Sequence, residues 1–363
     1  MHIKYLNLMN FRNYEYLQLE LNKGINIFMG NNAQGKTNIL ESLYYCCLAK
    51  SHRTNKDKEL INWNKEEAYI STYVCRERID KKIEIKIFSD GKKGIKINSI
   101  KIGKISELLG VFNVVMFSPE DLKIIKESPI FRRKFLDIEI SKLDSIYYYN
   151  LVQYNKVLNE RNSILKKWNE NSKDIISIYD EQLAKYGYYI IKRRVEYISQ
   201  MNSKGKPIHT DITTGEENIE FKYITAVNKI ENSADEIRLG LEKSIKKDVE
   251  RRSTSFGPHR DDFLVSINGI DTREYGSQGQ QRTAVLTMKF ASLEIMKDET
   301  KECPVLLLDD VLSELDIKRQ KYILNSIKNV QTFITCTGIE NIREHLKGNT
   351  SIFMISNGVA QIE

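Results

Sequence analysis

Near its N-terminus the chain contains Gly30-Asn31-Asn32-Ala33-Gln34-Gly35-Lys36-Thr37, a full match to the pattern G-x-x-x-x-G-K-[ST]. The apolar run before it, residues 25–29, suits a strand buried on both faces, and apolar residues from 40 to 48 follow helical spacing. A strand, a glycine loop and a helix N-terminus in this order bind phosphate through backbone N–H groups. We therefore expect a P-loop, in which Lys36 reaches the outer phosphates and Thr37 ligates Mg²⁺. The alternative is a turn before a capped helix.

A pair of carboxylates follows a second apolar run. Residues 305–308 are typical of a buried strand, and Asp309 and Asp310 come directly after them. A P-loop needs a further metal-binding group, so Asp309 is expected to hold Mg²⁺ through water. Asp310 stands where a carboxylate could orient or deprotonate the attacking water. The alternative is that both aspartates cap the next helix.

A third polar segment opens a helix that is predicted to run to about residue 297. Its sequence is Tyr275-Gly276-Ser277-Gln278-Gly279-Gln280-Gln281-Arg282. A hydroxyl and two glycines at a helix N-terminus make an anion site, which favours phosphate contact by residues 277–280. The alternative is a flexible loop with an ordinary N-cap.

Length and composition restrict the class of protein. The chain has 363 residues, enough for about two or three domains, and its 41% hydrophobic and 29% charged content excludes collagen-like and disordered classes. A net charge of +7 permits contact with nucleic acid without requiring it. The five cysteines, none spaced as C-x-x-C, argue against a disulfide scaffold or a zinc site. No run of residues resembles a membrane span or a signal segment, so we expect a cytoplasmic protein.

Hydrophobic periodicity predicts one α/β domain interrupted by a helical lobe. Alternating apolar residues predict mostly strands up to residue 120, and strands and helices alternate again from residue 256, as in a parallel sheet. Between them, residues 121–255 have helical spacing. The expected domains are therefore residues 1–120 with 256–363, and the inserted lobe 121–255.

Individual elements follow from the same patterns. Two apolar stripes predict an antiparallel helix pair over residues 147–165 and 179–201, joined by the polar residues 169–174. Further predictions are a small hairpin at 204–224, a helix at 231–252, a hairpin turn at Asn268-Gly269, strands at 263–267, 305–308, 332–335 and 352–355, and a helix at 317–328.

Taken in chain order, these motifs resemble the head of an ATP-binding-cassette (ABC) ATPase. The P-loop comes first, then Ser277-x-Gly279-Gln280 at the place of the signature, then Asp309-Asp310, then Ser313-Glu314-Leu315-Asp316 at the place of the D-loop. Within the DNA-repair branch of these heads the chain resembles the RecF family. Besides the P-loop, the motifs that carry this resemblance are Asn10-Phe11-Arg12-Asn13-Tyr14, Ser51-His52-Arg53-Thr54, residues 131–137, residues 257–262 and residues 307–316. It implies an α/β fold, an ABC-type P-loop ATPase head with a mixed sheet and an inserted, mainly helical lobe.

The resemblance also implies a function. It describes a recombination mediator that binds ATP, Mg²⁺ and duplex or gapped DNA, and that helps to load the RecA recombinase at single-strand gaps, with RecR and RecO as partners. Two copies would face each other across ATP, so that Ser277, Gln278, Gly279 and Gln280 of one copy close the P-loop site of the other. ATP turnover would be weak and stimulated by DNA. Arg12 would touch a nucleotide phosphate, although a surface arginine is an equal alternative.

The chain departs from the ABC pattern at three places. Asp310 stands where many relatives carry Glu, and its shorter side chain leads us to expect slow turnover. Cys336 and Thr337 occupy the position of the switch histidine, where Thr337 could donate a hydrogen bond to the nucleotide. No Q-loop glutamine occurs near residues 117–121.

The DNA contact is the least specific prediction. Basic clusters that could meet phosphates are residues 132–134, 166–167, 192–194, 246–247 and 251–252, although charge runs on helices are usually solvated faces. Without a helix-turn-helix or zinc-finger pattern, binding should follow backbone shape. His259 and Arg260 indicate a turn between the lobes at least as well as a catalytic role.

Two other functions stay open at this point. The cassette motifs alone would fit the nucleotide-binding subunit of an ABC transporter, but the helical insertion and the additional motifs argue against it. A scaffold with an inactive nucleotide site is the third alternative.

Overall fold

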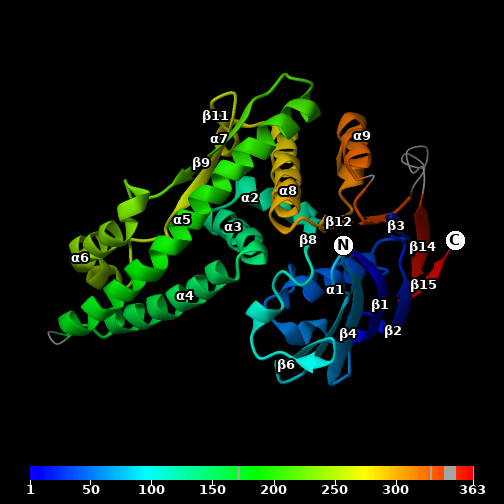
Figure 1. The fold of residues 1–363 in the computed structure, drawn as a ribbon, viewed down its shortest axis with the longest axis horizontal. Coiled ribbons are helices and arrows are strands. Elements are labelled where there is room, and N and C mark those ends of the chain that lie inside the picture. Colours follow the sequence, from blue (N-terminus) through cyan, green and yellow to red (C-terminus); the bar gives the residue numbers. More distant parts are fainter. Residues whose placement is uncertain (170–171, 328, 339–348, 363) are drawn as a thin grey trace. The chain divides into compact units, whose positions relative to one another are not determined.

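The apolar run before the P-loop forms β3 (Ile25–Met29), an interior strand of a six-stranded sheet with the order β15-β14-β3-β13-β12-β8 (Figure 1). In this computed structural model, which describes residues 1–169, 172–327, 329–338 and 349–362, only the pairing of β15 in this sheet is antiparallel. The other strands are β8 (Val114–Phe117), β12 (Val305–Asp309), β13 (Thr332–Cys336), β14 (Thr350–Ser356) and β15 (Val359–Ile362). β12 and β13 are buried along their whole length, as continuous apolar runs in a parallel sheet require.

A second six-stranded sheet, antiparallel throughout, is built from the N-terminal strands. Its order is β2-β1-β4-β5-β6-β7, with β1 (His2–Phe11), β2 (Tyr14–Glu20), β4 (Glu67–Cys75), β5 (Lys81–Phe88), β6 (Lys93–Ile97) and β7 (Ile100–Lys101). The alternating residues Ile83, Ile85 and Ile87 are fully buried, as predicted for one face of a strand. α1 (Lys36–Leu48) contacts strands of both sheets, which explains why almost all of its side chains are buried.

The inserted part is mainly helical. It contains α2 (Lys123–Lys126), α3 (Pro129–Leu143), α4 (Ser145–Lys166), α5 (Ser172–Thr213) and α6 (Ser233–Arg251). Asp144, just before α4, accepts a hydrogen bond from Tyr189, and Arg161 near the end of α4 pairs with Asp180. Because these contacts run in opposite directions along α4 and α5, the predicted antiparallel pair is confirmed. Residues 170–171 of the predicted connection lie outside the described residues.

A small antiparallel sheet accompanies these helices, in the order β11-β10-β9. It is formed by β9 (Ile219–Ile224), β10 (Asp262–Ile267) and β11 (Ile270–Asp271), and it leads through α7 (Thr272–Tyr275) into α8 (Gln278–Thr300). The Asn268-Gly269 turn between β10 and β11 and the helix predicted to follow the polar segment are both confirmed. α9 (Ile317–Ser326) also agrees with its prediction, whose last residue, 328, lies outside the described residues.

The hairpin predicted at residues 204–224 is wrong. α5 continues to Thr213, and β9 pairs with the distant strand β10. Gly205 suggested a turn, but it lies inside the helix where a Cβ atom would come within 2.9 Å of the Phe221 ring. The glycine therefore permits close packing of a helix on a sheet.

The chain divides into two compact units, which are Met1–Asp121 with Ser292–Glu363 and Leu122–Ala291. The units are divided after residue 121 and again within α8. Two contacts explain the second division. His209 of α5 bonds Thr287 of α8 at 2.9 Å, and Asn202 of α5 bonds the Phe221 backbone of β9 at 2.7 and 2.9 Å. The small sheet and the first part of α8 thus belong to the helical unit, while the division into functional domains stays a prediction.

Residues 257–262 form a turn that holds the elements of the helical unit together. The Pro258 carbonyl accepts a hydrogen bond from Arg194 of α5 at 2.7 Å, and His259 Nδ1 lies 2.7 Å from the Tyr154 hydroxyl of α4. Gly257 has a φ of 121°, and a Cβ there would lie 2.5 Å from that hydroxyl. These contacts all lie within one unit, so they do not support the predicted role of this turn between the lobes.

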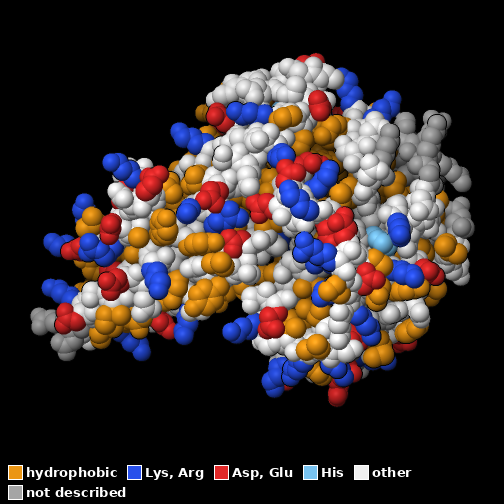
Figure 2. Space-filling view, viewed as in Figure 1, with side chains coloured by type: hydrophobic (Ala, Val, Ile, Leu, Met, Phe, Trp, Pro, Cys, Tyr) orange, Lys and Arg blue, Asp and Glu red, His pale blue; other side chains and the backbone are white. Residues whose placement is uncertain are grey.

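Two of the basic clusters contain buried arginines. Arg132 is 3% exposed and pairs with Asp262 at 2.6 Å, and Arg194 is 2% exposed and pairs with Asp137 at 2.7 Å. These two arginines pair with partly buried carboxylates and do not themselves face solvent, so the prediction that they contact DNA is wrong. The clusters at 166–167, 246–247 and 251–252 are exposed. On the face in Figure 2, the Lys and Arg side chains over α6 are interspersed with Asp and Glu.

The neutral form of His259 should contribute to stability. Its Nε2 lies 3.1 Å from the Thr254 carbonyl, so the ring donates there and accepts from Tyr154 at Nδ1. Burial lowers the pKa of His259 to about 4 from 6.5. The unfolded chain therefore binds the extra proton between these values, and the stabilisation present above about pH 6.5 is lost as the pH falls towards 4.

We predict that the pH dependence of unfolding distinguishes the wild type from His259→Gln, whose amide can donate and accept without titrating. From pH 6.5 to 5 the free energy of unfolding of the wild type should fall, relative to the variant, by about 1 kcal/mol per pH unit. Urea unfolding at several pH values measures this difference. A constant difference across the range would contradict the neutral, buried assignment.

Candidate nucleotide-binding site

The P-loop follows β3 and curves into the N-terminus of α1. Gly30 and Gly35 have φ values of 154° and 110°. A Cβ at Gly30 would lie 2.3 Å from the Ile355 carbonyl oxygen, and one at Gly35 would lie 2.5 Å from Asn13 Nδ2. Both glycines of the motif are therefore required by the close approach of neighbouring segments, in addition to the room that they leave for a phosphate.

Lys36 lies inside the curve of this loop. Its Nζ donates hydrogen bonds to the carbonyl oxygens of Gly30 at 2.6 Å and Asn31 at 2.9 Å. Burial lowers the pKa of Lys36, and the nearby carboxylate of Asp310 offsets part of this effect. The ammonium is thus held at the loop by neutral carbonyls, a position from which it can reach bound phosphates.

Thr37 and Asp309 are brought together although they lie far apart in the sequence. Thr37 Oγ1 donates to Asp309 Oδ1 at 2.8 Å, and Thr335 Oγ1 of β13 donates to the same oxygen at 2.8 Å. Burial raises the pKa of Asp309, and these two hydroxyl donors lower it by less. A hydroxyl and a carboxylate side by side suit Mg²⁺, which binds few protein oxygens and keeps several waters. Among the described residues, no group of three or more His, Cys, Asp or Glu could hold a metal by itself.

Asp310 turns the chain away from β12. Its φ is 54°, a rare conformation for a non-glycine residue, and its N–H donates to Thr335 Oγ1 at 2.8 Å. Ser313 Oγ bonds the Asp310 carbonyl at 2.7 Å and its carboxylate at 3.2 Å. The constrained backbone points to a functional position, since such strain persists only where the surroundings impose it. The cap of α9 is a different residue, Asp316, which accepts from Arg319 N at 3.0 Å.

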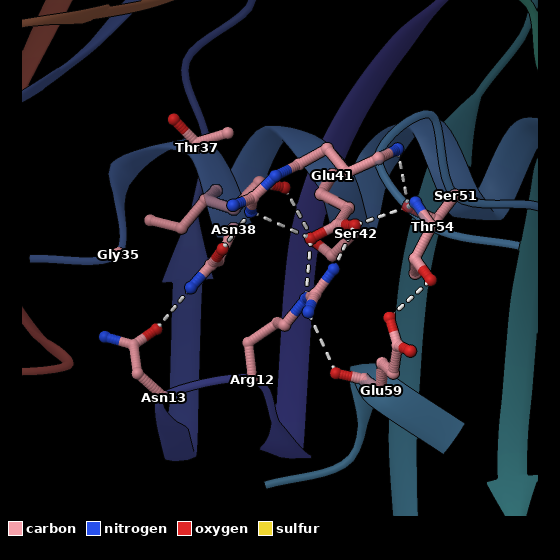
Figure 3. A network of polar contacts seen from close by, with 12 residues as sticks. Arg12, Asn13, Gly35, Thr37, Asn38, Glu41, Ser42, Ser51, Thr54 and Glu59 are labelled. Atoms are coloured by element: carbon pink, nitrogen blue, oxygen red, sulfur yellow. Dashed lines mark hydrogen bonds and ion pairs between the residues drawn. The ribbon is translucent and has the colours of Figure 1, made fainter. Parts of the chain in front are cut away.

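Arg12 is bound by a carboxylate of the protein. It forms a two-pronged ion pair with Glu41 of α1, with Nε–Oε2 at 2.9 Å and Nη2–Oε1 at 2.7 Å, and it also donates to the Glu59 carbonyl (Figure 3). It is therefore not a simple surface arginine. Its predicted contact with a nucleotide phosphate stays a prediction.

Glu41 is the centre of a polar network that the sequence analysis missed. Its fully buried carboxylate also accepts from Ser51 at 2.5 Å and from Arg53 at 3.4 Å. Arg53 bonds Asn38 at 2.8 Å, so the network extends along α1 beside the P-loop (Figure 3). Burial alone would raise the pKa of Glu41, but the hydrogen bonds from Arg12 and Ser51 outweigh it and the pKa is lowered. The available signal was an acidic residue within an otherwise apolar helix pattern.

The signature segment (residues 277–280) is an ordered helix N-terminus. Ser277 Oγ accepts from Gln280 N at 3.2 Å, and Gln280 Oε1 accepts from Ser277 N at 2.9 Å, which together form a capping box. Ser277 and Gln278 are exposed. This capping box is the ordinary N-cap that the sequence analysis gave as the alternative to an anion site. Contact of this segment with a nucleotide stays a prediction. The segment belongs to the helical unit and the P-loop to the other.

Comparison with known proteins gives consistent results. The family model described as RecF/RecN/SMC N terminal domain matches residues 2–361. The DNA replication and repair proteins RecF of Clostridium novyi (strain NT) and Clostridium kluyveri are 64% and 62% identical, over 99% of each chain. A structure described as the recombination mediator protein RecF-ATPrS in the RecFOR pathway has a TM-score of 0.92 at 41% identity, covering 99% of this chain and 98% of that one. A Smc head domain from Pyrococcus furiosus, with a TM-score of 0.58, 16% identity and coverage of 100% and 96%, shares the fold.

We predict that Glu41→Gln destabilises the P-loop unit. Removing one partner of a buried ion pair leaves Arg12 without its carboxylate and should cost about 2–3 kcal/mol. The matched control is Glu15→Gln, whose 77% exposed carboxylate faces Lys65 at 3.7 Å and should contribute less than about 0.5 kcal/mol. Urea unfolding at pH 7 measures both variants.

The pH dependence gives a second check on Glu41. Because its folded pKa lies below the ordinary 4.5, the stabilisation is present above pH 4.5 and is lost as the pH falls further. The difference between the wild type and Glu41→Gln should shrink in acid. Equal effects of the two variants at pH 7 would show that the network adds nothing to stability.

Proposed function

The chain belongs to the RecF family, and on that premise we propose that it is an ATP-dependent, DNA-binding recombination mediator of replication and repair. Its fold is that of an ABC-type ATPase head, as the resemblance implied. The observation that carries the proposal is the meeting of Lys36, Thr37 and Asp309 at one end of the sheet. The match over the whole chain to RecF relatives argues against a transporter subunit. Among the described helices, none combines the length and apolar character needed to cross a membrane.

ATP and Mg²⁺ are the proposed ligands of the P-loop site. Residues 30–37 would bind the phosphates through backbone N–H groups, and Lys36 would reach the outer ones. Thr37 and Asp309 would hold Mg²⁺, which when bound neutralises charge on the β- and γ-phosphates. Asp310 would orient or deprotonate the attacking water. In support, a solved relative that is 40% identical is described as RecF-ATP.

The nucleotide would act as a switch between two copies of the chain. In this proposal the signature segment of one copy, with its exposed Ser277, closes the P-loop site of the other, so that ATP becomes part of the interface. Hydrolysis removes the γ-phosphate and lets the pair open, which limits how long the protein stays on DNA. Weak ATP turnover that is stimulated by DNA would suit a nucleotide that limits the time the protein spends on DNA.

Partners and location follow the family. Two solved structures described as RecF in the RecFOR pathway support RecR and RecO as the proposed partners. Loading of RecA at single-strand gaps is the outcome that we propose for this chain. DNA binding would follow backbone shape, and the exposed residues at 166–167, 246–247 and 251–252 remain its candidate contacts. A cytoplasmic location is part of the same proposal.

We predict that ATP drives dimerisation through Ser277. Light scattering of the wild type should give a dimer with ATP and a monomer with ADP, whereas Ser277→Arg should stay monomeric because the bulky cation blocks the closing contact. Ser89→Arg, the same change at an exposed serine of the other unit, is the control and should behave like the wild type. A wild type that remains monomeric with ATP at micromolar concentrations would overturn the switch.

We further predict that turnover depends on Lys36 and Asp309. Lys36→Ala should abolish nucleotide binding or turnover, because the outer phosphates lose their nearest positive charge, while Lys50→Ala at an exposed lysine should change neither. Asp309→Asn should abolish turnover that the parent shows, which would exclude an inactive scaffold. ATPase assays and binding of a fluorescent ATP analogue measure both steps. Wild-type turnover in Lys36→Ala would mean that the site lies elsewhere.

A further inference from the structure

Glu217 connects the end of the long helix α5 to the signature segment. It lies between α5 and β9, and its Oε1 accepts a hydrogen bond from Gln280 Nε2 at 2.9 Å. Its other oxygen, Oε2, lies 3.2 Å from His209 Nε2 of α5. One carboxylate thus binds a residue of the signature segment on one side and a buried histidine on the other.

His209 is itself fixed by α8. Its side chain is fully buried, and Nδ1 lies 2.9 Å from Thr287 Oγ1, in the part of α8 that belongs to the same unit. Because a carboxylate only accepts, Nε2 of His209 donates its hydrogen to Glu217. Glu217 is therefore held in place by the His209 ring, which is packed in the core of the helical unit.

These contacts fix the amide of Gln280 at both ends. Its Oε1 accepts from the Ser277 backbone, and its Nε2 donates to Glu217. Without Glu217 the amide would be free to rotate, and the capping box would lose the acceptor that orients it. The orientation of the exposed Ser277 hydroxyl depends on the same turn.

We propose that Glu217 is a positioning residue for the signature segment, with His209 holding Glu217 in place. It keeps Gln280, and through it Ser277, in the arrangement that closes the nucleotide site of a second copy. This inference rests on the proposed ATP-driven pairing of two chains. Glu217 itself touches no nucleotide in this scheme, so its loss should lower turnover without weakening ATP binding at the P-loop of the same chain.

Two variants separate hydrogen bonding from charge. Glu217→Ala removes both contacts, whereas the amide of Glu217→Gln can accept from Gln280 and donate to the other tautomer of His209. A carboxylate near a helix N-terminus also interacts with the helix dipole, and Gln removes that charge while keeping the contacts. The control is Glu216→Ala, an adjacent exposed carboxylate.

The first experiment measures kcat, the KM for ATP and the Kd of a fluorescent ATP analogue on the full-length chain. For Glu217→Ala we expect kcat to fall about tenfold, the effect of one lost positioning hydrogen bond, with the Kd unchanged. Glu217→Gln should recover most of this loss, and Glu216→Ala should match the wild type. Wild-type kcat in Glu217→Ala, or equal losses in the Ala and Gln variants, would overturn the proposal.

The second experiment mixes variants. Lys36→Ala lacks a working P-loop but keeps its signature segment, so a mixed pair with Glu217→Ala contains one intact site and turnover should return. Ser277→Arg mixed with Lys36→Ala is the parallel test of the pairing itself. Recovery with Ser277→Arg but not with Glu217→Ala would overturn the role of Glu217 alone, whereas full turnover by Ser277→Arg by itself would overturn the proposed function.

Discussion

The carboxylate of Asp309 ties together the segments that form the nucleotide site. It ends β12 and accepts hydrogen bonds from Thr37 at the start of α1 and from Thr335 on β13. Thr335 also accepts from the backbone of Asp310, so a single buried group of hydroxyls sets both the helix and the turn that follows the strand. A buried carboxylate without these donors would cost several kcal/mol or bind a proton. The P-loop and the Asp-Asp pair therefore depend on one another for their geometry.

The sequence predicts the parts of the molecule that are specified locally. The run Ile25–Met29, the glycines at 30 and 35 and the Asn268-Gly269 turn each carry their own conformational signal, and all three form as expected. The hairpin predicted around Gly205 is wrong because a glycine indicates close packing but does not identify the residue that packs against it. At Gly205 that residue is Phe221, on a strand that pairs with residues much later in the chain.

Charged residues are harder to interpret, because their partners are distant in sequence. Arg194 finds Asp137, and Arg132 finds Asp262, so basic clusters that could have met DNA contain buried structural arginines. The partner of Arg12 could not be predicted either, because nothing in the neighbouring sequence indicated Glu41. Several motifs that carry the family resemblance thus build the fold around the site, in addition to any contact with ligand.

Each of the two units contains a carboxylate that orders the segments around it. Within the helical unit, His209 and Glu217 link α5 to the first turn of α8, where the signature segment begins. Within the other, Glu41 of the helix that follows the P-loop binds Arg12 and Ser51 from two further motifs. In the proposed composite site, each half would therefore be held in place by a carboxylate that binds the neighbouring segments of the same unit.

In the proposed pair, ATP is bound between the P-loop of one copy and the signature segment of another. A structure of the protein with a nonhydrolysable ATP analogue and Mg²⁺ tests it most directly. We expect Ser277 and the N-terminus of α8 from a second copy to lie within hydrogen-bond distance of the γ-phosphate held by Lys36. A bound analogue whose γ-phosphate meets no signature segment of any copy would contradict it.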